Sequence, residues 1–198
     1  GVTYESGSGD YAEWLEREFE DEPMTYGDLV GVNGGRITKA TRGAEQVMVV
    51  SFKPIVLGNM PEAGKEHLYE KVAFMGQVPV KVLGAVAEGD YILPSGKHNG
   101  IGVAVPPTEM TSDDYRRVVG RAWASSDHEH LKFVNVAVGL PTNDIVDIIQ
   151  HQEVDLEKVN ARVLNLEKKL ASLETLVAAL NLPDDASSVR SAGRGEED

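Results

Sequence analysis

The sequence predicts a mainly β domain, a compact antiparallel barrel or sandwich with short helices, followed by a C-terminal parallel coiled coil. Two observations support this prediction. Between residues 23 and 140, apolar runs of about five residues alternate with turns rich in glycine and proline, which is typical of small antiparallel β domains. Over residues 144–181, leucine and valine instead recur with the heptad period of a coiled coil. The composition agrees, because 20 glycines accompany an aromatic content of only 6%.

The N-terminal segment, residues 1–22, is strongly acidic and is expected to contain a short helix. Tyr11 and Leu15 can share one face of a helix over residues 11–19, and Ser8 or Asp10 can cap it with Glu13 in a capping box. An acidic run of this kind is usually a solvated face. Eight carboxylates stand against the single cation Arg17, namely Glu5, Asp10, Glu13, Glu16, Glu18, Glu20, Asp21 and Glu22.

Turn residues divide the central domain, residues 23–140, into strands. The run Asn33-Gly34-Gly35 predicts a hairpin. The apolar stretch 72–83 is interpreted as two short strands broken near Gly76 and Pro79, and residues 55–61 are expected to form a loop. The other strands are expected at residues 26–32, 36–40, 46–52, within 88–96, and at 101–105, 121–126 and 133–140.

One short helix is expected late in this domain, over residues 111–120. Thr111 or Ser112 can cap it, and acidic residues occupy its first turn. The strands at 121–126 and 133–140 then form a closing hairpin with the loop 127–130 at its tip.

A heptad repeat occupies the stretch 144–181, and every a and d position over four heptads is leucine or valine. This narrow, regular pattern is typical of a coiled coil rather than of a helix packed on its own domain. Position a holds Leu156, Val163, Leu170 and Val177, and position d holds Val159, Leu166, Leu173 and Leu180. Arg162 at position g precedes Glu167 at position e, the charge pattern of parallel helices. The repeat predicts an oligomer without fixing the number of strands.

Residues 183–198 contain mainly serine, glycine and charged side chains. They offer almost nothing apolar to bury, so we expect a disordered tail there.

Composition and charge exclude several classes of partner. The net charge is −13, and binding a polyanion requires clustered lysine and arginine, so no nucleic acid is expected. No apolar run approaches the ~18 residues needed to span a bilayer, and the acidic N-terminus lacks a signal-peptide pattern, so no membrane partner is expected. The absence of cysteine excludes disulfides and thiolate ligands.

Neither a metal nor a cofactor is expected. His128 and His130 flank Glu129, but no third ligand is identifiable, and clusters at loop tips are mostly solvated. The segment 95–100 holds a serine and a histidine, yet it is more simply a turn. No glycine-rich loop ending in lysine joins a strand to a helix, as a phosphate-binding loop requires.

The acidic N-terminal stretch also contains the parts of a self-cleaving backbone. Such a site needs a hydroxyl that attacks the preceding peptide carbonyl, a permissive backbone and a group that moves protons. Ser6 or Ser8 can supply the hydroxyl, and Asp10 and Glu13 can supply carboxylates whose pKa rises on burial or beside like charges. The residues alone leave open whether this stretch cleaves itself or only caps a helix.

Several stretches together resemble one known family, the autoproteolytic intramolecular-chaperone domain of phage neck-appendage proteins. The most specific part is the Asp-Tyr-Ala-Glu piece within Ser-Gly-Ser-Gly-Asp-Tyr-Ala-Glu-Trp-Leu-Glu at residues 6–16. The resemblance covers roughly residues 6–140. The other stretches that resemble the family are residues 49–59, 72–82, 89–96 and 118–123.

The resemblance implies a homotrimeric C-terminal domain that brings three chains into register and helps an upstream fibre shaft of the same polypeptide to fold. It then implies self-cleavage near the N-terminus, with Ser6 or Ser8 as the serine and Asp10 and Glu13 at the acidic positions of the motif. It also implies a component of a virion or phage-like particle, assembled in the host cytoplasm. Two alternatives are a non-cleaving trimeric fibre tip that binds a receptor, which would not be an enzyme, and a generic coiled-coil scaffold.

Overall fold

The computed structural model of the chain describes residues 9–139 and 143–180. The strands are β1 (Gly9–Arg17), β2 (Leu29–Asn33), β3 (Arg36–Thr38), β4 (Gln46–Val50), β5 (Val56–Gly58), β6 (Tyr69–Val82), β7 (Tyr91–Pro94), β8 (Gly102–Val105), β9 (Gly120–Ala122) and β10 (Lys132–Val138). The helices are two 3₁₀ turns (Glu66–Leu68 and Pro107–Glu109), α1 (Ser112–Tyr115) and α2 (Asn143–Leu180).

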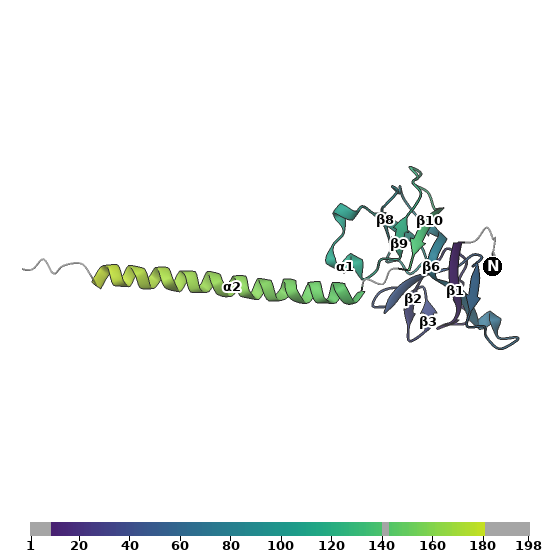
Figure 1. Ribbon diagram of the computed structural model, residues 1–198, viewed down its shortest axis with the longest axis horizontal. Helices are drawn as coiled ribbons and strands as arrows, with labels where there is room; N and C mark the ends of the chain where they lie inside the picture. The colour runs from purple at the N-terminus through teal and green to yellow at the C-terminus, as the bar shows by residue number, and fades with distance from the viewer. Residues whose placement is uncertain (1–8, 140–142, 181–198) are drawn as a thin grey trace, which may run out of the picture. The chain divides into compact units, whose positions relative to one another are not determined.

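Two closed rings of five strands share β6. One ring runs β6-β10-β9-β7-β8 and returns to β6, and the other runs β6-β4-β2-β3-β1 and returns to β6. Figure 1 shows β8, β9 and β10 on one side of β6 and β1, β2 and β3 on the other. The domain is therefore β-rich and contains a small five-stranded barrel, as the sequence predicted. The pairs β1–β3, β1–β5 and β6–β8 are parallel, which the sequence did not predict.

β6 is one continuous strand, so the prediction of two short strands at 72–83 was wrong. Residues 69–77 pair with β1, and residues 76–82 pair with β10. Near the change of partner the ladder to β1 shifts register, because Tyr11 pairs with Met75 whereas Ala12 pairs with Ala73. Phe74 is the extra residue of this β-bulge. Gly76 and Pro79 thus lie where the strand changes partner, and neither ends it.

Each of two hydrophobic clusters is built from valine, leucine and isoleucine side chains of the rings. The larger cluster includes Val78, Val80 and Val82 of β6 with Ile92 and Val136. The smaller cluster includes Val72 of β6 with Leu15, Val30, Ile37 and Val50. β6 therefore contributes to both clusters.

The N-terminal segment forms a strand, so the short helix expected over residues 11–19 was wrong. β1 pairs with β6 over eight residue pairs and with β5 and β3 on its other edge. Ala12 and Leu15 are the buried apolar residues of this strand, and their spacing of three imitates a helical face. Pairing with three strands outweighs this local pattern, because tertiary contacts routinely override helix propensity.

Other expectations for the central domain are confirmed. Asn33 and Arg36 pair across a two-residue turn in which Gly34 and Gly35 both have positive φ. β9 and β10 form the closing hairpin, and Thr111 caps α1 in a capping box with Asp114. Two expectations were wrong in part. Residues 55–61, expected to be a loop, include the short strand β5, and the helix expected over residues 111–120 is α1, which spans only Ser112–Tyr115.

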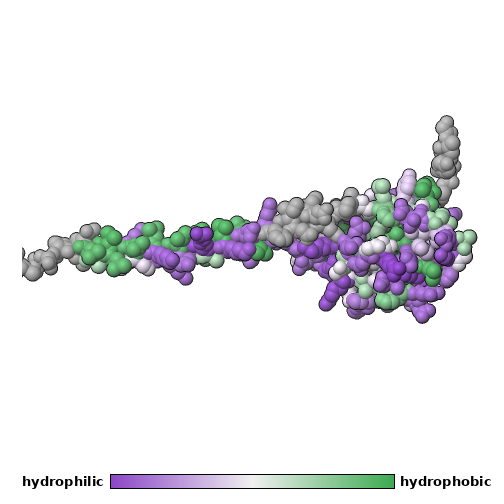
Figure 2. All heavy atoms as spheres, turned by 90° about the horizontal axis from the view of Figure 1, so that it is seen from below, coloured by the Kyte–Doolittle hydropathy of each residue, from purple (hydrophilic) through white to green (hydrophobic). Residues whose placement is uncertain are grey.

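The C-terminal heptad stretch is a single helix, α2, of 38 residues. All eight a and d side chains are exposed, from 45% at Val163 to 81% at Leu180. Figure 2 shows apolar side chains gathered along this helix beside polar ones. Residues 183–198, the expected tail, lie outside the described residues. Within the described part of the chain, no helix is long and apolar enough to cross a membrane.

Candidate functional site

The first candidate residue, Asp10, lies at the start of β1 and is only 3% exposed. It is opposite Gly76 of β6, and its backbone carbonyl accepts a hydrogen bond of 2.8 Å from the Ile55 amide. The backbone of Asp10 is therefore held on both edges of the strand.

Gly76 leaves no room for a side chain beside this aspartate. Its φ is 116°, in the region that favours glycine. A Cβ added there would overlap the carbonyl oxygen of Gly9 and lie 2.8 Å from the Cα of Asp10. The glycine allows β6 to approach the start of β1 closely at the position of the bulge.

Ser51, directly after β4, lies beside the Asp10 carboxyl and is also buried at 3% exposure. Neither Asp10 Oδ2 nor Ser51 Oγ makes a well-formed hydrogen bond to any described residue. Burial raises the pKa of the Asp10 carboxyl, and the Ser51 hydroxyl and the backbone amide of Asp10 itself lower it only in part. A carboxyl of this kind keeps its proton to higher pH than a solvated one and can deliver it as a general acid.

Glu13 is placed differently, because it is exposed on β1. Successive residues of a strand point to opposite faces, so two residues three apart lie on opposite sides. Glu13 instead lies over Gly58 of β5, where a Cβ added to the glycine would lie 3.4 Å from Glu13 Cγ. The structure thus does not bring Asp10 and Glu13 together, whereas a helix would have placed them on one face.

The two candidate serines, Ser6 and Ser8, lie outside the described residues. Asp10 follows Ser8 by two residues in the sequence. What the described residues contribute is therefore a buried carboxyl with a raised pKa beside the segment in which self-cleavage is predicted.

Sequence reasoning missed the contribution of Ser51. A signal was present, because a serine directly after the apolar run Val47–Val50 places a hydroxyl at the end of a buried strand. The sequence did not indicate which carboxyl would face it, because β4 and β1 are not paired with each other and meet only through the folded ring.

A second buried aspartate, Asp28, has a complete set of partners. Its Oδ1 lies 2.6 Å from Lys81 Nζ, and its Oδ2 lies 3.3 Å from Lys39 Nζ. The Thr25 amide donates a further hydrogen bond of 2.9 Å to Oδ2. A buried charge that is paired and hydrogen-bonded in this way is structural.

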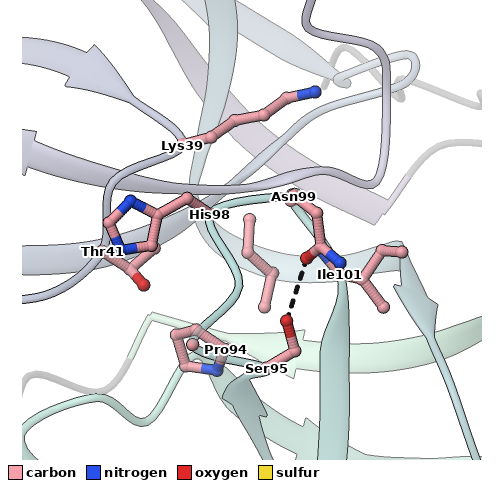
Figure 3. Close-up of a pocket in the computed structure, with 10 residues that line it drawn as sticks. Lys39, Thr41, Pro94, Ser95, His98, Asn99 and Ile101 are labelled. Carbon is pink, nitrogen blue, oxygen red and sulfur yellow. Dashed lines mark hydrogen bonds between the residues drawn. The ribbon is translucent and has the colours of Figure 1, made fainter.

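A surface pocket beside this aspartate is formed partly by the turn at residues 95–100 (Figure 3). The Ser95 hydroxyl and Asn99 Oδ1 lie 2.9 Å apart, and Asn99 Oδ1 also accepts a hydrogen bond from the Ile101 amide. The prediction of a turn is therefore confirmed, and Ser95 is used within it. His98, with φ of 53°, lines the same pocket.

The histidines of the loop 127–130 are solvated. His128 and His130 are both exposed. Across residues 9–139 and 143–180, no group of three histidine, aspartate or glutamate side chains is placed to hold a metal ion.

The chain is similar in structure to a bacteriophage protein, as the sequence resemblance predicted. It matches the crystal structure of the bacteriophage phi29 gene product 12 C-terminal fragment at a TM-score of 0.46 and 14% identity, over 65% of this chain and 99% of that one. It matches the pre-mature bacteriophage phi29 gene product 12 at a TM-score of 0.49 and 13% identity, over 70% of this chain but only 22% of that protein. No protein-family model and no curated protein match the chain.

Proposed function

We propose that the chain is a C-terminal intramolecular chaperone that brings three copies of an upstream fibre or appendage into register, and that it releases itself by one cut near its N-terminus. The observation that carries this proposal is the seam of α2, in which eight leucine and valine side chains at a and d positions are all exposed. Burial of one such side chain stabilises an assembly by about 1.5–3 kcal/mol. A seam of this length therefore favours association of several helices.

Association through a helix, whose own contacts are local in sequence, suits a domain that helps an upstream shaft to fold. A long trimeric β shaft must close large loops and align three chains before its contacts form. A coiled coil forms from local contacts and raises the effective concentration of the attached chains. The sequence resemblance supports three strands, and it supports a role as a component of a virion or phage-like particle assembled in the host cytoplasm.

The proposed cut uses Asp10 as a general acid. The hydroxyl of Ser6 or Ser8 adds to the carbonyl carbon of the preceding peptide bond, and its proton leaves to solvent. The carbon–nitrogen bond then breaks, and the amide nitrogen takes a proton from Asp10, which leaves an ester. Water hydrolyses this ester, which restores the serine hydroxyl and gives a new carboxyl end. Asp10 is favoured over Glu13 because Asp10 is buried and has a raised pKa, whereas Glu13 is exposed.

Two leucines of α2 allow a matched test of the seam. Leu166 at position d and Leu164 at position b are 57% and 58% exposed in the single chain. We expect light scattering to give a trimer for the wild-type chain and for Leu164→Ser, and a large loss of trimer for Leu166→Ser. A monomeric wild-type chain, or equal loss in both variants, would contradict the proposed coiled coil.

The cut is tested by expressing the chain with its upstream shaft and weighing the products. We expect two products, with a cut before Ser6 or Ser8 that disappears in Ser6→Ala or Ser8→Ala. Asp10→Asn should slow the cut by about 10²-fold or more, the usual contribution of a general acid. Glu13→Gln is the matched control and should cut normally. A single intact species in a folded trimer would instead favour the non-cleaving fibre tip.

A further inference from the structure

We infer that Ser51 is a positioning residue of the proposed cleavage site, which holds the Asp10 carboxyl in place and stabilises it after it has given up its proton. This inference rests on the proposed self-cleavage and adds a residue that its motif does not include. Its starting point is that the Ser51 hydroxyl lies beside the Asp10 carboxyl, and that Asp10 Oδ2 and Ser51 Oγ are each buried without a well-formed hydrogen bond to any described residue.

Unpartnered buried polar atoms are rare and call for an explanation. The other buried aspartates of the described chain have partners. Asp28 is paired with Lys39 and Lys81, and Asp90 Oδ2 accepts a hydrogen bond of 2.8 Å from the Ala87 amide. Asp10 is thus the buried aspartate that keeps a free oxygen, and it is also the one next to the predicted cut.

The backbone on both sides of this pair is fixed. The Ser51 amide donates a 2.7 Å hydrogen bond to the Lys71 carbonyl, and the Asp10 carbonyl accepts one from the Ile55 amide. Gly76 closes the space behind the start of β1, because it admits no Cβ there. A β-bulge in the same place is in keeping with this reading, since bulges often lie beside active sites and re-aim side chains.

A serine hydroxyl suits a carboxyl that changes charge. It accepts a hydrogen bond from the protonated acid, and it donates one to the carboxylate after a simple rotation. Ser51 can therefore follow Asp10 through the step in which its proton passes to the amide nitrogen of the broken bond. No bond to Ser51 forms or breaks in this step.

Among the groups that face Asp10, Ser51 is the side chain that changes the pKa of the Asp10 carboxyl. β6 faces it with Gly76 and Gln77, and the segment after β4 faces it with Ser51 and Ile55. The pKa of Asp10 responds to burial, to Ser51 and to its own backbone amide, and no charged side chain of the described residues contributes. Removal of the Ser51 hydroxyl should therefore raise the pKa of Asp10 further.

The first test is a titration of the Asp10 carboxyl by carbon NMR in the full 198-residue chain. We expect the midpoint in Ser51→Ala to lie above that of the wild type, and Ser51→Thr to restore it in part. Ser95→Ala removes a hydroxyl that is used in a distant turn and should leave the midpoint unchanged. An unchanged midpoint in Ser51→Ala would overturn the inference.

The second test follows the cut against pH in the chain with its upstream shaft. A general acid works in its protonated form, so the rate should fall as pH rises through the pKa of Asp10. In Ser51→Ala this fall should move to higher pH, and the maximal rate should drop. A purely structural serine would leave the pH of the fall unmoved.

Failure of this inference is separable from failure of the proposed function. If the wild-type chain cuts itself and Ser51→Ala shows the same rate and pH profile, the assignment of Ser51 is wrong and self-cleavage stands. If the wild-type chain never cuts at any pH, the proposed self-cleavage is wrong, and the catalytic role of Ser51 fails with it, whatever the titration shows.

Discussion

Asp10, Asp28 and Asp114 show how surroundings give one residue type different roles. Burial without a charged partner raises the pKa of Asp10. Asp28 is equally buried but has two lysine partners. The pKa of Asp114 is lowered, first by its hydrogen bond with the Thr111 side chain at the start of α1. At Asp10, burial without a charged partner thus favours the protonated form of the carboxyl.

The raised pKa of Asp10 predicts a pH-dependent cost in stability. The unfolded chain gives up this proton near its ordinary pKa of about 3.9, whereas the folded chain holds it to higher pH. The stabilising contribution of the proton is therefore complete below the unfolded pKa and is lost as pH rises through the folded pKa. Asp10→Asn cannot ionise, so its Tm should exceed that of the wild type at neutral pH, and this difference should shrink in acid.

Thermal unfolding of both chains from acidic to neutral pH measures this difference. Asp155→Asn changes an exposed aspartate of α2 and should give no such trend. A difference between Asp10→Asn and the wild type that is independent of pH would contradict a raised pKa at this position.

At the scale of the elements, the Asp28 cluster joins three strands of one ring. Asp28 directly precedes β2, Lys39 directly follows β3, and Lys81 lies in β6. The lysine side chains are 15% and 19% exposed, so the cluster is largely removed from water. Because two cations share this one carboxylate, its replacement would remove the charge partner of both lysines.

Asp28→Asn should therefore destabilise the β domain strongly. It keeps the shape of the side chain but leaves two partly buried ammonium groups without their charge partner, a loss of about 3–5 kcal/mol when a buried pair is broken. Asp155→Asn breaks the exposed pair with Lys158 and should cost about 0–1 kcal/mol. Urea unfolding of the two variants measures both values, and equal small losses would show that the cluster contributes little.

The elements also show which parts of the fold could be predicted from the sequence. The hairpin at Gly34 and Gly35 and the long helix α2 depend on local spacing, and both were predicted correctly. The strand β1 was mistaken for a helix because Tyr11 and Leu15, which are four residues apart, could share one face of a helix. Its ladder to β6 links residues that are distant in sequence, and no local pattern reports such a partner.

The candidate site also depends on a contact between residues that are distant in sequence, which no local pattern reports. Asp10 was found from its motif, and its proximity to two glycines and two serines was visible in the sequence. Ser51 is more than forty positions away along the chain and meets Asp10 only after the second ring closes. Glu13 was paired with Asp10 on the assumption of a helix, and the strand moves it to the opposite face.

At the scale of the whole molecule, the chain divides into two compact units, residues 1–150 and 151–198. Both hydrophobic clusters draw all their residues from the first unit. The second unit contains most of α2, whose apolar seam is exposed in the single chain. The first unit thus has its own core, whereas the described residues of the second unit contribute to neither cluster.

This division predicts that the β domain folds without the long helix. A chain that ends at residue 142 should be a monomer whose β signal melts in one transition, at a temperature independent of concentration, because its core lies within residues 15–138. The full chain should show an additional helical transition that rises with concentration, because binding only in the folded state makes Tm concentration-dependent. Leu166→Ser combined with Leu173→Ser is the control and should remove that dependence while the β transition stays. An unfolded truncated chain would mean instead that the three β domains stabilise one another through contacts of their own.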